Sequence, residues 1–436
     1  MKLLFLTTYN VPIEVEHYFT INVWKGLCEE FTQDSSDILA IATILEVPQK
    51  IDSHIKEEAC NERISYKLYY SSFLSDEEKI REIVHFFRYI APDVIHSNMI
   101  DVIDVAAAKI CNIPIVLTIH IGGFICPRSG GNGFLKYDDS ICNDKVGRHC
   151  LRCCSQDLPF PFLTSLLYQL IPGAIREWAY QKLKDKHIFY VTEFLIKSHD
   201  EVKRKKAIEI YKYATIIAAN QHLKDLLALN GLTDNVILLP HGVEPRQRLP
   251  FPEIEDVVKF FYLGRIQYAK GLHNLMKAFK GINNSLYELH IIGDAEQSRR
   301  TLRYDKYIRR LAIGKNVYFH GRLHNSEIES VINDMHVMIH PANFLEVYGI
   351  SIAESLSIGR PVLATRCGGS EMQVQDGVNG WLVPSNNIVA LHDKVVDIIQ
   401  HKEQIEKMSE KCSLPHALTT YCMNLISIYN SKIKNY

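Results

Sequence analysis

Short apolar runs alternate with longer amphipathic segments along most of the 436-residue chain. Between two of these runs lies MIDVIDVAAAKICN, whose apolar positions recur at the three- and four-residue spacing of a helix. Such alternation is typical of doubly wound parallel sheets. We expect strands at 3–8, 38–44, 94–96, 115–120, 216–219 and 236–239, and again at 260–263, 289–292, 317–319, 337–339 and 362–364.

The pattern breaks once, at PHGVEPRQRLPFPEIEDV, where proline and charged residues dominate. This composition is typical of a linker. The break predicts two successive α/β domains with a boundary near residues 240–257. In an α/β domain of this type, ligands bind outside the carboxyl ends of the strands.

Charge and composition narrow the class of protein. The 49 Lys and Arg residues are balanced by 50 Asp and Glu residues, which excludes a generally basic nucleic-acid binder. The apolar run in MKLLFLTTYNV is too short for a signal peptide and lacks a small-residue cleavage site. We therefore expect a cytoplasmic protein whose eleven cysteines are thiols or metal ligands and not a disulfide framework.

The first candidate site is the segment FYLGRIQYAKG, residues 261–271. An expected strand ends at Gly264, Arg265 follows, and Lys270 precedes a helical run. Two cations and a helix N-terminus at the carboxyl end of a strand form a suitable cradle for phosphate. The alternative is that both are surface cations in a loop.

The second candidate site is HPANFLEVYGISIAESLSIGRPVLATRCGG, residues 340–369. Glu346 and Glu354 enclose seven residues, and Gly349 lies where the chain can turn into a helix beginning near Ile350. A carboxylate before this turn can accept hydrogen bonds from sugar hydroxyls, and one a turn into the helix can hold a vicinal diol such as ribose. The alternative is a capped helix with two solvated acids.

These motifs resemble those of retaining glycosyltransferases of family four. The resemblance rests on the E-x7-E element, the G-R-x4-K-G loop, GRPVLAT, GGSEMQVQDGVNGWLV, VILLPHGVE and PDVIHSNMIDVIDVAAAKICNIPIVLTIH, from about residue 90 to 385. It implies the GT-B fold, with two Rossmann-like domains facing a central cleft and a C-terminal helix that crosses back to the first domain. The expected limits are 1–245, with an insertion at about 121–186, then 246–412, and 413–436 for the helix.

The resemblance also implies roles for individual residues. Arg265 and Lys270 match the pair that binds the donor diphosphate. Glu354 matches the acid that holds the ribose, Glu346 the acid that contacts the donor sugar, and His120 a histidine close to the transferred sugar. His120 could otherwise be a structural histidine at a strand end. The other expected donor-binding positions are Gly264, Leu323, Gly349, Ile350 and Ser351.

The implied activity is transfer of a sugar from a nucleotide-diphosphate sugar to a hydroxyl acceptor, such as a glycan or lipid-linked glycan, with retention at the anomeric carbon. Catalysis would need no metal or other cofactor. A nucleotide-sugar epimerase and a non-catalytic glycan-binding or scaffold protein are the alternatives. The donor sugar, its base and the acceptor stay open. The family's usual glycines after the first strand are missing from YNVPIEVEHYFT.

The insertion after His120 contains a cluster of cysteines, namely Cys126, Cys142, Cys150 and Cys153, with Cys154 as a fifth thiol. Four thiolates that include a C-x2-C pair can complete a tetrahedral zinc site. We weigh a structural zinc ion against free thiols, an iron–sulfur cluster and a disulfide.

An apolar stretch follows at 158–175, LPFPFLTSLLYQLIPGAI, and Trp178 extends its helical stripe. Its three prolines disfavour a membrane-spanning helix. Two interpretations stay open: a helix buried against its own domain, or a helix on the cytoplasmic surface of a membrane, held there also by Lys182, Lys184 and Lys186.

Overall fold

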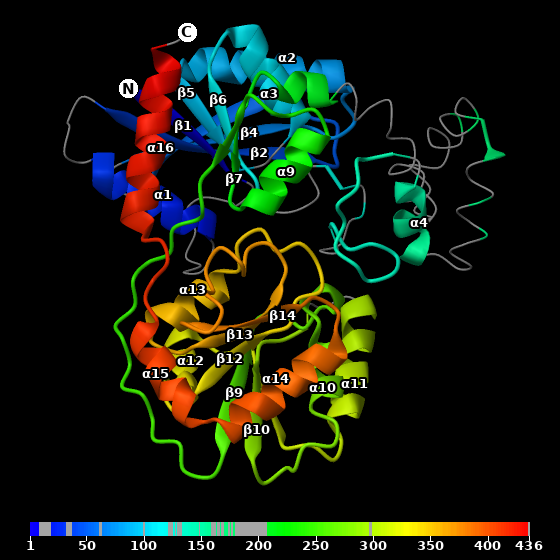
Figure 1. Cartoon of the computed structure of the whole chain (residues 1–436). Coiled ribbons are helices and arrows are strands. Elements are labelled where there is room, and N and C mark those ends of the chain that lie inside the picture. Colours follow the sequence, from blue (N-terminus) through cyan, green and yellow to red (C-terminus); the bar gives the residue numbers. More distant parts are fainter. Residues whose placement is uncertain are drawn as a thin grey trace. The chain divides into compact units, whose positions relative to one another are not determined.

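The computed structural model describes residues 1–7, 19–31, 37–60, 63–98, 101–120, 125–126, 128, 133–147, 149–157, 163, 166, 170–172, 175, 178, 207–295 and 299–434. The chain divides into two compact units (Figure 1). Unit 1 comprises Met1–His120, Asp200–Glu244 and His416–Tyr436. Unit 2 comprises Ile121–His199 and Pro245–Pro415.

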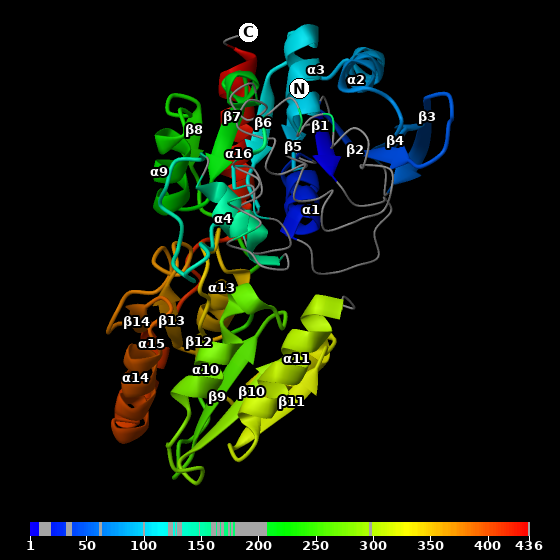
Figure 2. The ribbon, with the colours of Figure 1, turned by 90° about the vertical axis from the view of Figure 1, so that its right-hand side faces the viewer.

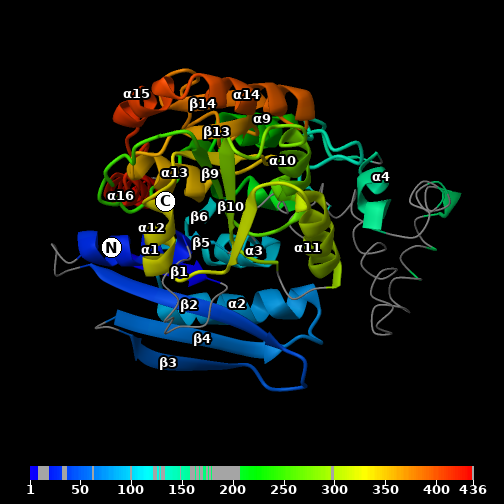
Figure 3. The same ribbon diagram turned by 90° about the horizontal axis from the view of Figure 1, so that it is seen from below.

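Unit 1 is built on one sheet with the strand order β3-β4-β2-β1-β5-β6-β7-β8. All its neighbouring strands are parallel except β3, which is antiparallel to β4. Figure 3 shows β2, β4 and β3 side by side at one edge. The strands are β1 (Lys2–Thr7), β2 (Ile38–Val47), β3 (His54–Cys60), β4 (Arg63–Ser71), β5 (Val94–Ser97), β6 (Ile115–Thr118), β7 (Thr215–Ala218) and β8 (Val236–Leu238).

Helices cover the sheet of unit 1, and its C-terminal helix is one of them. Phe5 of β1 packs in one apolar cluster with Trp24 of α1 and Leu425 of α16, and Figure 1 shows α16 beside α1. The chain therefore returns to unit 1 at its end, as the GT-B resemblance implies. The helices are α1 (Phe19–Phe31), α2 (Asp76–Ile90), α3 (Val102–Cys111), α9 (Gln221–Leu229) and α16 (Leu418–Ile433).

Unit 2 contains a second sheet, in which all neighbouring strands are parallel and the order is β11-β10-β9-β12-β13-β14 (Figure 2). The chain leaves β9 in one direction along the sheet and resumes at β12 in the other, so β9 and β12 flank the topological switch point. The strands are β9 (Val258–Leu263), β10 (Tyr287–Ile292), β11 (Val317–Gly321), β12 (Val337–His340), β13 (Val362–Arg366) and β14 (Gly380–Pro384).

Successive residues of a strand point to opposite faces of a sheet, and β9 shows this directly. Phe260 lies in the apolar cluster formed with α10, α11, α14 and α15, whereas Phe261 packs with residues of α12 and α13 on the other face. Unit 2 thus has the three-layer arrangement of a doubly wound domain. Its helices are α10 (Leu272–Ala278), α11 (Arg299–Ala312), α12 (Asn325–Ile332), α13 (Ile350–Ser357), α14 (Ile388–Gln400) and α15 (Glu403–Lys411). The insertion contributes α4 (Cys150–Cys154).

All eleven expected strands are present, with ends within three residues of those expected. Three strands were not expected, namely β3, β4 and β14. In β3 and β4 charged residues interrupt the apolar positions, as in HIKEEAC, because β3 forms the edge of the sheet. Edge strands commonly carry charges that prevent further pairing.

The units differ from the expected domains in one respect. The structure groups the insertion with unit 2, whereas we expected it in the N-terminal domain. A hydrogen bond of 2.7 Å from the Tyr268 hydroxyl to Asp139 is one contact that joins the insertion to unit 2. The described part of the chain contains no helix with both the length and the apolar character that crossing a bilayer requires.

Candidate active site

Three candidate residues meet at the switch point of unit 2. β9 ends at Leu263 and leads through Gly264 to Arg265, while its neighbour β12 ends at His340 and leads to Glu346. Lys270 closes a short 3-10 turn, Tyr268–Lys270, just before α10. The sheet topology thus places the phosphate-loop motif and the first acid of the E-x7-E element at adjacent strand ends.

Lys270 and Glu346 form an ion pair, with 2.5 Å between Nζ and Oε2. Their side chains are only 17% and 13% exposed, so Lys270 is not the surface cation of the alternative interpretation. The reason is the loop after β12, which carries Glu346 to the lysine. The Nε2 atom of His340 lies 3.4 Å from the same carboxylate oxygen. Burial alone would raise the pKa of Glu346, but Lys270 and His340 outweigh it and hold that pKa well below its usual range.

Arg265 is exposed, in line with the expected loop. Its carbonyl oxygen accepts a hydrogen bond of 2.7 Å from the hydroxyl of Tyr262, which is buried in β9. The backbone at Arg265 is therefore anchored to the core while the guanidinium side reaches solvent. A fixed backbone with an exposed cation suits a residue that binds a soluble anion.

The turn before α13 is held by side-chain and backbone hydrogen bonds. Gly349 is the N-cap residue with φ of +83°, a conformation that favours glycine. The side-chain amide of Gln373 donates to the carbonyl groups of Tyr348, Gly349 (3.3 Å) and Gly369 (3.1 Å). Ile350 and Ser351 are the first residues of α13, where backbone amides have no partner within the helix. The site therefore contains a preorganised helix N-terminus suited to an anion.

Glu354 has a partner that the sequence analysis missed. The Nη2 atom of Arg246 donates to its Oε1 atom at 2.6 Å, and the backbone amide of Arg246 donates to the Ser357 hydroxyl at 3.0 Å. Burial raises the pKa of Glu354, and Arg246 opposes that rise. Arg246 lies in the linker segment, and its two contacts place this part of the linker beside α13.

Two other expected donor-binding positions, Gly264 and Leu323, make fewer specific contacts. Gly264 follows β9, and Gly293 follows the neighbouring strand β10. The two backbones approach so closely that a Cβ atom added at Gly293 would lie 1.9 Å from the Gly264 carbonyl oxygen. Leu323 follows β11 and is half-buried against the apolar cluster beneath α12 and α13.

His120 lies in unit 1, two residues after β6. Its Nε2 atom is 2.6 Å from the Oδ1 atom of Asn98, whose own amide nitrogens both donate to the Leu6 carbonyl. Phe19 contacts the ring edge-on at 5.4 Å, and His241 lies 5.3 Å away. Burial lowers the pKa of His120. A neutral ring that donates from Nε2 to Asn98 keeps Nδ1 as an acceptor.

Most of the segment YNVPIEVEHYFT, which lacks the family's usual glycines, lies outside the described residues, and so do its polar residues Glu14, Glu16 and His17. His241, in the segment VILLPHGVE, is buried and stacks on Phe19 with 4.1 Å between ring centroids. It belongs to the aromatic cluster around His120.

All four candidate metal-binding cysteines are free thiols in the structure. Burial raises the pKa of Cys142 and Cys153, and that of Cys150 to about 11, which argues against a reactive thiolate at these positions. Within the described ranges, no three His, Cys, Asp or Glu side chains are already arranged to hold a metal ion.

The described residues of the apolar stretch are exposed. Leu170 is 72% exposed, Trp178 63% and Ile175 53%, and Leu163, Leu166 and Ile171 are exposed as well. These values contradict the interpretation of a helix buried against its own domain. Lys182, Lys184 and Lys186 lie outside the described residues.

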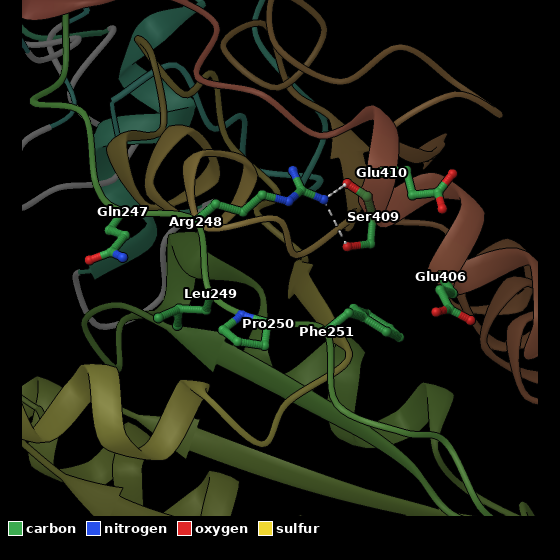
Figure 4. Close-up of a pocket in the computed structure, with 8 residues that line it drawn as sticks. All are labelled: Gln247, Arg248, Leu249, Pro250, Phe251, Glu406, Ser409 and Glu410. Carbon is green, nitrogen blue, oxygen red and sulfur yellow. Dashed lines mark hydrogen bonds between the residues drawn. The ribbon is translucent and has the colours of Figure 1, made fainter.

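A surface pocket of about 410 Å³ lies between the linker segment and α15 (Figure 4). In it, Arg248 donates to the Ser409 carbonyl at 2.6 Å and to the Ser409 hydroxyl at 3.3 Å. None of the residues that line this pocket belongs to the candidate site. Arg248 therefore anchors the linker, whereas Arg246, two residues earlier, contacts Glu354.

Similarity to solved structures identifies the fold. The chain aligns over 99% of its length with the whole of the Anabaena protein HepE in complex with UDP and glucose, with a TM-score of 0.63 and 14% identity. It aligns over its full length with sucrose-phosphate synthase from Thermosynechococcus elongatus, with a TM-score of 0.64 and 15% identity. The fold is GT-B, as expected.

The sequence of unit 2 is similar to a known family. Residues 244–413 match the family of glycosyl transferases, group 1, in agreement with the resemblance that the motifs suggest. The chain is 27% identical over 152 residues to D-rhamnosyltransferase of Pseudomonas aeruginosa, covering 34% of this chain and 38% of that protein. It is 24% identical over 232 residues to poly(glycerol-phosphate) alpha-glucosyltransferase of Bacillus subtilis, and this alignment covers 51% of this chain and 34% of that protein. The matches thus span only about a third of each of these curated relatives.

Proposed function

We propose that this protein is a retaining glycosyltransferase that moves a sugar from a nucleotide-diphosphate sugar to a hydroxyl acceptor during glycan, polysaccharide or glycolipid biosynthesis. The observation that carries the proposal is the Lys270–Glu346 pair at the switch point between β9 and β12. Ligands of open α/β sheets bind at such a point. The group 1 match of unit 2 supports the same reaction class.

In this proposal Arg265, Lys270 and the amides at the start of α13 bind the diphosphate. As the glycosidic bond breaks, negative charge grows on the leaving phosphate, and these groups stabilise it. The Lys270 ammonium has three donors, so it can bind a phosphate oxygen while keeping its hydrogen bond to Glu346. Because two cations already neutralise the phosphate, we propose that turnover does not depend on a divalent metal.

The two acids have separate tasks. Glu346 is ionised at neutral pH because Lys270 and His340 favour its charged form, and its oxygens can accept hydrogen bonds from the donor sugar. Glu354 accepts from the ribose hydroxyls, and Arg246 both orients it and favours its ionised form. Arg246 is a positioning residue in this proposal, because it acts through Glu354.

His120 is the candidate polar group of unit 1, which we assign to the acceptor side. In its neutral form Nδ1 can accept a hydrogen bond from a sugar hydroxyl, while Asn98 holds the ring through Nε2. In the proposed reaction the acceptor attacks from the face that the diphosphate leaves, and the phosphate takes the acceptor's proton.

A donor screen tests the proposal. UDP-, GDP- and ADP-sugars are supplied with acceptor mixtures, with and without added magnesium, and both the released nucleoside diphosphate and the anomeric configuration of the product are followed. The proposal predicts a glycoside with the donor's configuration and a rate that magnesium does not change. An epimerase would release nucleotide without a glycoside, and a scaffold would release neither.

We also propose that the segment from Leu163 to Trp178 contacts a lipid surface. The exposed apolar side chains support this proposal, because large contiguous apolar surfaces on a protein mark interaction sites. The three lysines at 182–186 would favour anionic lipids. Such contact would bring the protein to a lipid-linked acceptor.

A further inference from the structure

The cysteine-rich segment has a defined local structure. Leu135 and Ile141 form an antiparallel bridge, and the Cys142 amide donates to the Phe134 carbonyl at 2.7 Å. Residues 134–142 are therefore a β-hairpin, and Cys142 ends its second arm. Phe134 and Leu135 are almost fully buried, so the hairpin has a small apolar core.

The C-x2-C pair lies on α4, which begins at Cys150. Cys153 follows one turn later, and residues three apart share one face of a helix. A chain that presents one thiol from a hairpin and two from the first turn of a helix supplies ligands from two rigid elements. Cys126 lies in the segment before the hairpin.

The four thiols interact with one another, and one of them accepts a hydrogen bond from a backbone amide. Each of the six pairs among these thiols interacts electrostatically. The Gly147 amide donates to the Cys150 sulfur at 3.5 Å. Hydrogen bonds to sulfur are a recurring feature around metal-bound thiolates.

We propose that Cys126, Cys142, Cys150 and Cys153 bind one structural zinc ion that fixes the hairpin against α4. Around a zinc ion, sulfur atoms lie about 3.8 Å apart, since each Zn–S bond is about 2.3 Å. Zinc binding releases the thiol protons and draws the four sulfurs together.

The hairpin also contacts the candidate active site. Asp139 lies at its tip and accepts the 2.7 Å hydrogen bond from Tyr268, which is two residues before Lys270. Tyr268 stacks on His273 of α10 with 4.5 Å between ring centroids. A zinc ion in the insertion would thus stabilise a hairpin that holds one side of the Arg265–Lys270 loop.

The first test measures metal content in the full-length protein, purified without a metal-affinity column. We expect about one zinc per chain, in line with one four-thiolate site. Exchange for cobalt should give thiolate-to-cobalt charge-transfer bands and the visible bands of tetrahedral cobalt. Cys150→Ser and Cys142→Ser should lose the metal, whereas Cys154→Ser, the matched control one residue beyond the C-x2-C pair, should keep it. A wild-type chain that binds neither zinc nor cobalt would overturn the proposal, as would unchanged metal in Cys150→Ser.

A second test needs no variant and covers the case in which a variant fails to fold. The wild-type protein is first freed of bound metal with a chelator and then alkylated with N-ethylmaleimide with and without added zinc, and each labelled cysteine is mapped by mass spectrometry. Zinc should slow the labelling of all four proposed ligands at least tenfold and leave Cys28 and Cys111 unchanged. Equal labelling with and without zinc would overturn the proposal. UDP affinity, measured in parallel, tests the proposed function separately, because the nucleotide site needs none of these thiols.

Discussion

Lys270 and Glu346, which are 76 positions apart in sequence, form a largely buried ion pair at the carboxyl ends of two neighbouring strands of unit 2. In the pair each charge compensates the other, which lowers the free-energy cost of holding both side chains largely out of solvent. The pair therefore contributes both to the stability of the loop and to the electrostatics of the site.

The pair predicts a specific pH dependence of stability. Because the pKa of Glu346 is depressed in the folded state, its stabilising contribution is fully present above the unfolded carboxyl pKa of about 4.3 and is lost as pH falls below it. Glu346→Gln should lower the free energy of unfolding by on the order of 1–3 kcal/mol at pH 7, between the values for exposed and buried pairs.

Urea denaturation of both proteins from pH 8 to pH 3 checks this prediction. The difference between wild type and Glu346→Gln should stay constant down to about pH 5 and shrink below it. A difference that grows on acidification would contradict the depressed pKa.

A second prediction concerns Arg246 and Glu354. Removing the guanidinium should raise the pKa of Glu354 further, because burial would then act unopposed. Arg246→Ala should weaken UDP binding about tenfold, the effect of one lost charge-assisted interaction. The loss should be greater at pH 6 than at pH 8, because more of Glu354 is then protonated.

Calorimetric titration with UDP at both pH values measures this effect. Arg248→Ala is the matched control, since Arg248 lies on the same segment but bonds to Ser409 and the Cys412 carbonyl. Equal losses in the two variants, or a loss that does not vary with pH, would show that Arg246 does not act through Glu354.

Most of the framework was predictable from the sequence, for physical reasons. Buried strands of parallel sheets are continuous apolar runs, so β9, β12 and their neighbours were found from Phe260, Met338 and similar positions. Gly264, Arg265 and Lys270 were found because glycine and cations after a strand form a recognisable phosphate loop. The family match supports this choice.

The contacts that orient the site were not predictable in the same way. Arg246 lies in a segment whose Pro and charge content indicates a linker, and nothing local shows that it reaches Glu354, 108 positions away. In the sequence Gln373 and Asn98 are ordinary polar residues. Only the folded chain shows that Gln373 bonds to the Gly349 turn and that Asn98 bonds to His120. Long-range pairing of this kind leaves no periodic signal in a single sequence.

A third prediction tests the lipid-surface proposal. Vesicles that contain an anionic phospholipid should bind the protein, and added salt should reduce binding because the lysines contribute electrostatically. Leu166→Glu combined with Leu170→Glu should abolish binding without loss of stability, since both side chains are exposed.

Ile313→Glu is the control for this experiment, because Ile313 is 77% exposed elsewhere in unit 2 and should tolerate the same change. Vesicle sedimentation measures binding, and thermal unfolding measures stability. Unchanged sedimentation of the double variant would refute a membrane role for this segment.

Turnover of the phosphate-site variants tests the central claim most directly. With the donor identified in the screen, Arg265→Ala and Lys270→Ala should each lower turnover by roughly 10²–10³-fold, the usual loss when one electrostatic donor to a transition state is removed. Lys277→Ala, on the exposed face of α10, should keep near-normal turnover. Near-normal turnover in both Arg265→Ala and Lys270→Ala would show that the diphosphate binds elsewhere and would contradict the proposed site.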